Sequence, residues 1–283
     1  MGDFNIFHHM PWAATYSIYF FVIGISAALF FFSTLSWFSD AFVPIRMKAF
    51  LVSFGLLAIS GLLLIGDLAQ PMRFINILNP MYLNLTSPLA WGGLNLMSFG
   101  LVSALYFLAM YAQHPGAKAL GVVGSLLALG LPVYTGFDLT VHQNRPVWNT
   151  PLMPVLFVAM SLVSGASVAA LLARGEESVL RLLRPIMLWS AGAVAVMLIS
   201  LLGTTSYGGV GAQLTFMYLT SGQLGIVFVG IGILAGLMLP IILLFESLGN
   251  RGGVKAAAAL LLVGGMALRY SILIGGQIVQ TYY

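Results

Sequence analysis

The residues best suited to chemistry gather in one polar stretch, positions 134 to 149, between two long apolar segments. This stretch holds a phenol at Tyr134, a carboxylic acid at Asp138, an imidazole at His142 and a guanidinium at Arg145. Only 6% of the 283 residues are charged. Because polar groups at membrane depth are costly and usually functional, we expect the working site here.

Tyr134, Asp138 and His142 follow one another at intervals of four residues. If a helix runs through all three, they share one face and could pass protons from one to the next. If the helix ends near Phe137, the three residues only surround its end. The spacing alone leaves both interpretations open.

Four other charged residues have comparable alternatives. Arg145 could hold Asp138 or Asp67 ionised by pairing with it, or could anchor the chain at the membrane surface. Asp67 ends an apolar segment, where it could accept protons from a ligand or simply begin a loop. Arg269 lies well inside the last apolar segment and needs a partner, for which we expect Asp67 or Asp138. This could be a structural ion pair or a catalytic arrangement, while Arg73 could contact lipid or its own loop.

Composition places the chain in the membrane. Hydrophobic residues make up 60% of it and the mean hydropathy is +1.02, against about 45–50% apolar residues in soluble domains. The absence of cysteine excludes disulfides and cysteine-ligated iron–sulfur clusters. The four histidines, His8, His9, His114 and His142, all lie outside the middle of any apolar segment, so we expect no haem and no metal. A metal site at Asp138 and His142 is the weaker alternative.

Eight apolar segments are long enough to cross a bilayer core of about 30 Å, and each should be a helix. They cover Ala13–Phe38, Ala49–Gly66, Ser87–Tyr111, Ala119–Phe137, Pro151–Ala173, Pro185–Leu202, Gln223–Phe245 and Ala256–Gly275. The fold class is therefore an all-α integral membrane protein with eight transmembrane helices. An even number of spans puts both termini on one side.

Lysine and arginine indicate which side that is. The loops after spans one, three, five and seven hold most of the eleven basic residues, namely Arg46, Lys48, Lys118, Arg174, Arg181, Arg184, Arg251 and Lys255. The loops after spans two, four and six hold only Arg73 and Arg145. Basic loops stay in the cytoplasm, so we expect both termini in the periplasm. The excess of basic residues then reflects orientation in a lipid bilayer, and we expect no nucleic-acid partner.

A faint duplication divides the chain into two halves. Trp12 and Trp148, as well as Tyr134 and Tyr270, are 136 residues apart, and the Met-Tyr-Leu triplet at 81–83 recurs at 217–219. An offset of four spans preserves orientation in the membrane. We therefore predict two four-helix bundles, residues 1–145 and 146–283, with the site in the first.

Four pieces of the chain resemble the NrfD/PsrC-type family of membrane subunits from polysulfide reductase and related respiratory complexes. They are residues 67–74 (DLAQPMRF), residues 86–92 (TSPLAWG), Tyr134 with residues 144–149 (NRPVWN), and Leu268-Arg269-Tyr270 with Gly276-Gln277. The resemblance implies a multi-pass protein of the bacterial inner (cytoplasmic) membrane. It also implies a quinone (menaquinone or ubiquinone) site near the outer face, without haem.

The resemblance further implies two kinds of partner. A ferredoxin-like subunit with four iron–sulfur clusters would dock on the outer loops, and a catalytic subunit, either a molybdopterin enzyme or a multihaem cytochrome, would lie beyond it. The chain itself would exchange electrons between the quinone pool and the iron–sulfur partner. The terminal substrate would be reduced by the catalytic subunit.

Residue roles also follow from the resemblance. Tyr134 matches a tyrosine that hydrogen-bonds a quinone carbonyl, and Asp67 matches a nearby acid. Where polysulfide reductase has a histidine and an asparagine on span one, this chain has Tyr19 and Tyr16. The expected catalytic residues are Asp67, Asp138 and Arg145; the expected quinone-binding residues are Tyr134, Tyr19, Tyr16, Asp67 and His142; the expected supporting residues are Arg73, Trp91 and Arg269.

Two other functions fit eight spans. A secondary transporter would show polar or broken helices near the midplane of the membrane, whereas the polar residues here gather at one rim. A passive anchor would tether partner subunits without quinone chemistry of its own. Both remain alternatives at this point.

Overall fold

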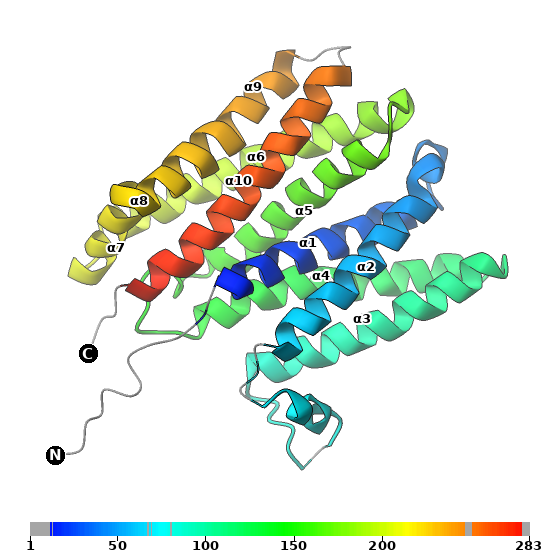
Figure 1. The fold of residues 1–283 in the computed structure, drawn as a ribbon, viewed down its shortest axis with the longest axis horizontal. Helices are drawn as coiled ribbons and strands as arrows, with labels where there is room; N and C mark the ends of the chain where they lie inside the picture. Colours follow the sequence, from blue (N-terminus) through cyan, green and yellow to red (C-terminus); the bar gives the residue numbers. More distant parts are fainter. Residues whose placement is uncertain are drawn as a thin grey trace.

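The described part of the chain folds into helices that lie side by side along one direction (Figure 1). The computed structural model describes residues 12, 14–66, 68, 70–79, 81–246 and 251–278, without the side chains of Glu246 and Arg251. Its α-helices are α1 (Ala14–Leu35), α2 (Arg46–Gly66), α3 (Pro88–Tyr111), α4 (Ala117–Thr140), α5 (Leu152–Leu172), α6 (Glu177–Ser206), α7 (Val210–Thr220), α8 (Gly222–Gly225), α9 (Leu239–Glu246) and α10 (Arg251–Ile278). Two short 3₁₀ helices, η2 (Asp40–Ile45) and η3 (Pro71–Leu78), and one π-helix, η4 (Ile226–Met238), complete these ranges.

The eight predicted spans are confirmed as helices long and apolar enough to cross a membrane. The seventh is a composite of α8, η4 and α9. The sixth begins at Glu177 and not at Pro185, because its first turns are polar and hydropathy does not register them. Arg181 and Glu177 form an exposed ion pair there, 3.7 Å apart and one turn from each other.

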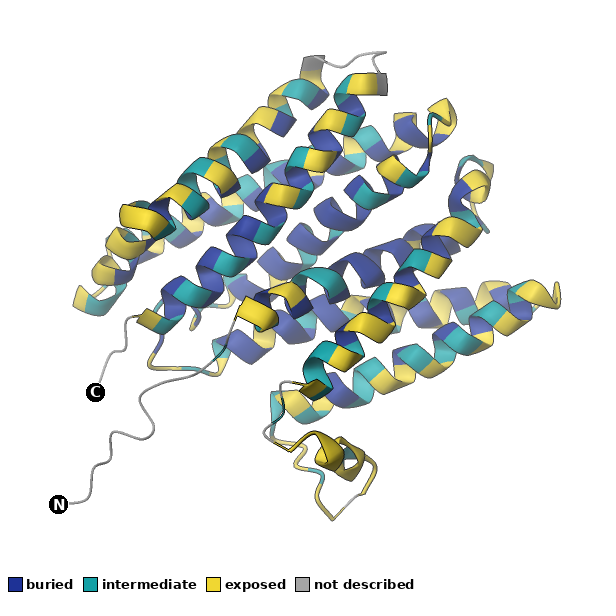
Figure 2. Cartoon of the chain, in the orientation of Figure 1, coloured by how far each residue is buried: buried dark blue, intermediate teal, exposed yellow. Residues whose placement is uncertain are grey.

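Three helices form the buried centre of the molecule. In α1, α5 and α10, 61–72% of the most apolar window is buried, whereas the other spans bury 28–44% (Figure 2). A membrane helix exposes apolar side chains to lipid, so the less buried spans form the outer layer. The site residues on α1 and α10 are thus held by the most enclosed helices.

Helix pairing follows the same pattern in both halves. In the first half α1 packs on α2 and α4, and α3 packs on α4; in the second half α5 packs on α6 and α10, and η4 packs on α10. Contacts of α1 with α5 and α10, and of α4 with α5, join the halves. The two-bundle division at residue 145 remains a prediction that this pattern supports.

Small residues allow the closest helix contacts. Gly236 of η4 and Gly264 of α10 bring their backbones together so closely that a Cβ on either would overlap the other glycine. Gly165 of α5 meets Ala28 of α1 in the same way. Such small-residue contacts drive helix association where lipid removes the hydrophobic force.

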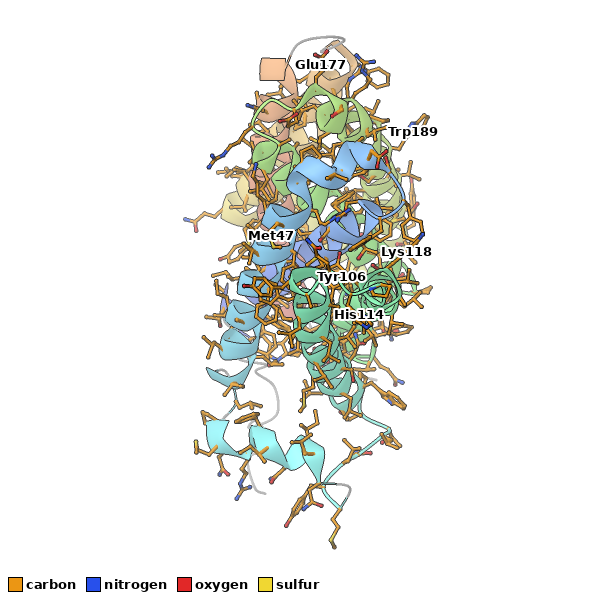
Figure 3. The ribbon with its side chains drawn as sticks, turned by 90° about the vertical axis from the view of Figure 1, so that its right-hand side faces the viewer. Met47, Tyr106, His114, Lys118, Glu177 and Trp189 are labelled. Carbon is orange, nitrogen blue, oxygen red and sulfur yellow. The ribbon has the colours of Figure 1, made fainter. Side chains whose placement is uncertain are left out.

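Helix α1 begins, and α10 ends, at one end of the molecule, called here the terminal face (Figure 1). The loop after α4 and the short helix η3 lie at this face as well. In Figure 3, Glu177 at the start of α6 lies at the opposite end of the molecule from η3, which is drawn in cyan. The candidate residues on α1, α4 and α10 therefore converge near the terminal face.

Candidate functional site

Three phenols and one carboxylate gather between α1 and α4, near the terminal face. Tyr134 and Asp138 lie one turn apart on α4, and Tyr16 and Tyr19 lie on α1, which packs against α4. Asp138 and Tyr16 each interact electrostatically with both Tyr19 and Tyr134. The structure thus brings together four of the residues expected from the sequence, and we call them the phenol–acid cluster.

The phenol–acid cluster is enclosed. Tyr19, Tyr134 and Asp138 expose only 3%, 7% and 9% of their surfaces. Within the described residues, Asp138 makes no hydrogen bond and no ion pair. Because burying a carboxyl group without partners is costly, an acid in this position is a strong candidate for a functional group.

Helix α3 fixes the position of Tyr134. The phenol ring lies flat against Gly92, where any Cβ would overlap the ring atoms. Glycine is therefore the residue that lets α3 approach the ring this closely. Sequence reasoning names Gly92 only as the last residue of the motif at 86–92. The pair that it forms with Gly93 near the start of a span is the signal that could have marked a close helix contact.

A cavity of about 690 Å³ adjoins the cluster between α2, α3 and η3. This volume falls in the usual range for ligand pockets. Leu64 of α2 lines the cavity and also packs beside Tyr16 and Tyr19. Gly93 lines it on the α3 side, where Ile77 of η3 rests against the glycine. The cavity therefore borders the phenols at Leu64 and at the Gly92–Gly93 pair.

Two expected supporting residues lie around this cavity. Arg73 of η3 lines it, together with polar groups from the loop that follows α2. Trp91 is 58% exposed, and its indole N–H donates to the carbonyl of Leu85 at 2.8 Å. Trp91 thus ties the loop to the start of α3. Asp67, the expected acid of this region, lies outside the described residues.

His142 lies apart from the cluster. Helix α4 continues to Thr140, so it carries Tyr134 and Asp138 on one face but ends before His142. The imidazole packs edge-on against Trp12 and Trp148, with ring centroids 5.2 and 5.6 Å away. Burial, together with the positive charge of Arg145, lowers the pKa of His142. Of the three residues of the predicted proton relay, Tyr134 and Asp138 thus share one face of α4, as a continuous helix predicts, whereas His142 lies beyond the end of the helix.

Arg145 binds the end of α10. Its guanidinium donates to the carbonyls of Gly276, at 3.3 Å, and Gln277. Beside it the Trp148 indole N–H donates to the carbonyl of Ile272 at 2.9 Å, with its ring packed on Gly276. A cation at a helix C-terminus satisfies carbonyls that lack partners within the helix.

Of the alternatives for Arg145, an ion pair with Asp138 is wrong. The guanidinium of Arg145 reaches across to α10, whereas Asp138 lies within α4 and faces α1. A pairing of Arg145 with Asp67 involves a residue outside the described ranges. Arg145 therefore acts here as a link between the loop after α4 and α10.

Arg269 is fully buried among α1, α5 and α10. It donates to the Ser161 and Ser164 hydroxyls at 3.3 and 3.4 Å and to the carbonyl of Gly265 at 3.1 Å. Its guanidinium also lies 5.3 Å from the ring centroid of Phe21. The expected pair with Asp138 is wrong, and no described carboxylate forms an ion pair with Arg269. Two serine hydroxyls, one carbonyl and a ring thus replace the acid.

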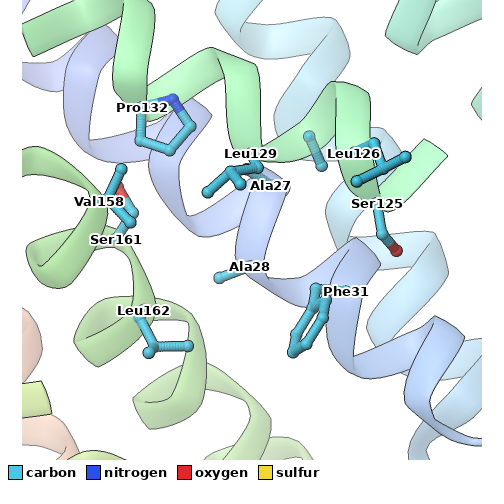
Figure 4. Close-up of a pocket in the computed structure, with 11 residues that line it drawn as sticks. Ala27, Ala28, Phe31, Ser125, Leu126, Leu129, Pro132, Val158, Ser161 and Leu162 are labelled. Carbon is cyan, nitrogen blue, oxygen red and sulfur yellow. The ribbon is translucent and has the colours of Figure 1, made fainter. Parts of the chain in front are cut away.

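A smaller cavity of about 300 Å³ lies where α1, α4 and α5 meet (Figure 4). Ala28, Pro132 and Ser161 line it from these three helices. Leu126, at its rim, is 67% exposed on the face of α4 that meets lipid. Hydrocarbon surrounds this space, so it offers little to bind a polar group. Within the described ranges, no three His, Asp or Glu residues come together to hold a metal ion.

Comparisons with known proteins identify the family of this chain. The family model described as "Polysulphide reductase, NrfD" matches residues 4–280. The chain belongs to the NrfD family. It is 26% identical to one of the chains of polysulfide reductase from Wolinella succinogenes, over 98% of this chain and 97% of that protein.

Two further relatives match this chain over shorter lengths. It is 27% identical to protein NrfD of Escherichia coli, over 58% of this chain and 59% of that protein. It is 29% identical to one of the subunits of tetrathionate reductase from Salmonella typhimurium, over 59% of this chain and 50% of that protein. The family expected from the sequence motifs is confirmed, and relatives in it are named as subunits of reductases.

Proposed function

We propose that this chain is the quinone-interacting membrane subunit of a respiratory oxidoreductase complex, with the phenol–acid cluster as its quinone site. The observation that carries the proposal is Asp138, a buried carboxyl group without hydrogen-bond partners in the described structure, between two buried phenols on facing helices. Membership of a family with reductase subunits supports the reaction class. The complex would act as a quinol-oxidising or quinone-reducing enzyme.

The residues present fit a quinone ring. Its two carbonyl oxygens require hydrogen-bond donors, and Tyr19 and Tyr134 supply phenol hydroxyls from two helices. The ring and its isoprenoid chain require an apolar space that opens near the membrane surface. The neighbouring cavity of about 690 Å³, which Leu64 and Gly93 line next to the phenols, would supply that space.

A bound quinol would supply two electrons and two protons. Asp138 would accept one proton from a quinol hydroxyl, because the carboxylate has no competing partner in the described structure. Tyr134, held by Gly92, would orient the ring by hydrogen-bonding one oxygen, and Tyr19 would hold the other. Asp67, an acid that the sequence places near the same end, would accept the second proton.

Partners and orientation complete the proposal. The chain would span the bacterial inner membrane with periplasmic termini, as the distribution of basic residues suggests. Electrons would pass to a four-cluster iron–sulfur subunit at the terminal face, and from there to a molybdopterin or multihaem catalytic subunit. Exposed apolar side chains at this face, including Met72 and Met81 at 82% and 91% exposure, favour contact with another protein.

The test is quinol oxidation by the intact complex in membrane vesicles. Tyr134→Phe and Asp138→Asn keep the size of each side chain and remove a donor and a proton acceptor. Each should slow oxidation about 10-fold or more, since one hydrogen bond to a reacting group contributes about 1.5–3 kcal/mol. Tyr111→Phe is the matched control, because that phenol is 80% exposed at the opposite end of α3. A normal rate in both site variants would mean that the protein is only a passive anchor.

The alternative that this chain is a secondary transporter needs a separate test. The purified chain in liposomes should not accumulate solutes. Solute uptake by the chain alone, with unchanged quinol oxidation after Tyr134→Phe, would replace the proposal with transport.

A further inference from the structure

The cavity beside the phenol–acid cluster meets the phenols at two borders of different stiffness. One border is the Gly92–Gly93 pair of α3, whose main chain lies against the Tyr134 ring. The other is the side chain of Leu64 on α2, which lines both the cavity and a narrow crevice beside Tyr16 and Tyr19. A helix main chain moves only when the helix shifts or unwinds, whereas a leucine changes rotamer without any main-chain movement. Leu64 is therefore the border that can open.

The phenols are closed off in this structure. Tyr19 and Tyr134 are buried, and the crevice that Leu63 and Leu64 form beside Tyr19 is far smaller than the cavity. Thr15 also lines the crevice, but it stands at the start of α1 and so at the terminal face. A ligand that enters from the hydrocarbon would therefore reach the phenols through the cavity and past Leu64.

Helix α2 leaves room for such a ligand. Gly61 lines the cavity one turn before Leu64, and a Cβ at Gly61 would meet no described atom within 4 Å. Leu89 and Met97 line the cavity from α3 and are themselves partly exposed, so the cavity reaches the surface that lipid covers. A side chain at position 61 would project into this space and narrow it.

We propose that Leu64 is the gate through which a quinone ring passes from the cavity to Tyr19 and Tyr134, and that its size determines which ring passes most readily. The inference rests on the proposed function, because it concerns the same quinone site. A change of rotamer at Leu64 opens the border between the cavity and the crevice. A naphthoquinone, with two fused rings, needs a wider opening than a single-ring benzoquinone. The isoprenoid chain stays in the cavity, in the space beside Gly61.

Quinol oxidation by the intact complex tests the gate, with a naphthoquinol and a benzoquinol compared. The readout is the ratio of kcat/KM for the naphthoquinol to kcat/KM for the benzoquinol. Leu64→Ala should raise this ratio about 10-fold and Leu64→Phe should lower it about as much, since a methylene group in an apolar site changes relative rates by about 10- to 200-fold. A variant that only weakens the fold slows both substrates alike and leaves the ratio unchanged. Leu62→Ala and Leu62→Phe are the matched controls, because Leu62 is 71% exposed on the same helix.

A thiol introduced at the gate tests it after folding is complete. The chain has no cysteine, so Leu64→Cys gives this chain a single thiol. Modification with a membrane-permeant alkyl maleimide adds bulk at the gate and should slow oxidation about 10-fold relative to the wild-type complex treated in the same way. Leu62→Cys, modified to the same extent by mass spectrometry, should keep its rate.

Filling the cavity is the third measurement. Gly61→Leu should slow the oxidation of both quinols about 10-fold, because the new side chain occupies the space that leads to the gate. Gly55→Leu is the matched control on the same helix. A Cβ there also meets no described atom within 4 Å, and Gly55 is not part of the cavity lining, so oxidation should stay normal.

Two results overturn the gate. They are a naphthoquinol-to-benzoquinol ratio that stays at the wild-type value in both Leu64→Ala and Leu64→Phe, and a normal rate in fully modified Leu64→Cys. Either result, with Tyr134→Phe and Asp138→Asn still slow, would leave the quinone site in place and give it another entrance. The proposed function fails in a different way, by a normal oxidation rate in Tyr134→Phe and Asp138→Asn, so the two failures can be told apart.

Discussion

Gly92→Ala adds one methyl group to α3 at the point where that helix touches the Tyr134 ring. The new Cβ would overlap three ring atoms of Tyr134, so the ring or the helix must move. Overpacking of this kind costs about 1–3 kcal/mol. A displacement of about 1 Å at a reacting group can lower a rate by about 100-fold. We therefore expect quinol oxidation to fall by about 10- to 100-fold while the protein still folds.

Gly100→Ala is the matched control on the same helix. A Cβ at Gly100 would meet only Leu57, at 4.0 Å, which is ordinary contact. Both substitutions remove a helix glycine and gain about 1 kcal/mol of helix propensity, so this gain cancels in the comparison. The assay combines quinol oxidation in membrane vesicles with thermal unfolding of the purified complex. A normal rate in Gly92→Ala would refute the role of α3 in positioning Tyr134.

Three further substitutions test the surroundings of the cluster. Burial and Arg145 hold the pKa of His142 below its ordinary 6.5, so the folded protein takes up this proton at lower pH than the unfolded chain. Thermal stability should therefore fall as the pH drops below about 6.5. The variant His142→Gln should not show this pH dependence. Arg145→Lys removes the forked guanidinium, so one ammonium group cannot satisfy both carbonyls at the end of α10. The free energy of unfolding, measured by denaturing-detergent titration or thermal unfolding, should fall by about 1–3 kcal/mol. Arg269→Met removes a buried charge that has no described acid, so its melting temperature should equal or exceed the wild-type value; a large loss would show that the cation is needed for folding.

The spans could be predicted because lipid imposes one rule on every crossing segment, and an apolar run long enough to cross must be a helix. The rule ends where the chain leaves the hydrocarbon. The polar first turns of α6 and the short helices η3 and α7 therefore escape a hydropathy reading. The π-helix of the seventh span could not be predicted either, since a uniformly apolar segment carries no periodic pattern.

The site was predictable in its residue types and less so in its pairings. Tyr134, Asp138, Tyr19 and Tyr16 come together because their positions on α1 and α4 face the same interface. The pairings of Arg145 and Arg269 with Asp138 were wrong, because sequence reasoning looked for carboxylates as the partners of buried arginines. The structure gives Arg145 the carbonyls of a helix end, a partner that no side-chain pattern reveals.

The second half of the chain shows the value of a weak repeat. The offset of 136 residues rests on few matches in the sequence. In the structure the helix pairs α1–α4 and α3–α4 of the first half correspond at this offset to the pairs α5–α10 and η4–α10 of the second half. A low-scoring pattern thus becomes useful once helix contacts can be compared position by position.

Infrared difference spectroscopy of quinone reduction and quinol oxidation tests the central claim most directly, because it reports the protonation of a single carboxyl group. The intact complex, loaded with quinone, is cycled between redox states. The account predicts a carboxylic acid C=O band that changes with the redox state and is absent in Asp138→Asn, while Tyr111→Phe keeps it. A wild-type spectrum without such a band, or a band that persists in Asp138→Asn, would contradict proton transfer to Asp138.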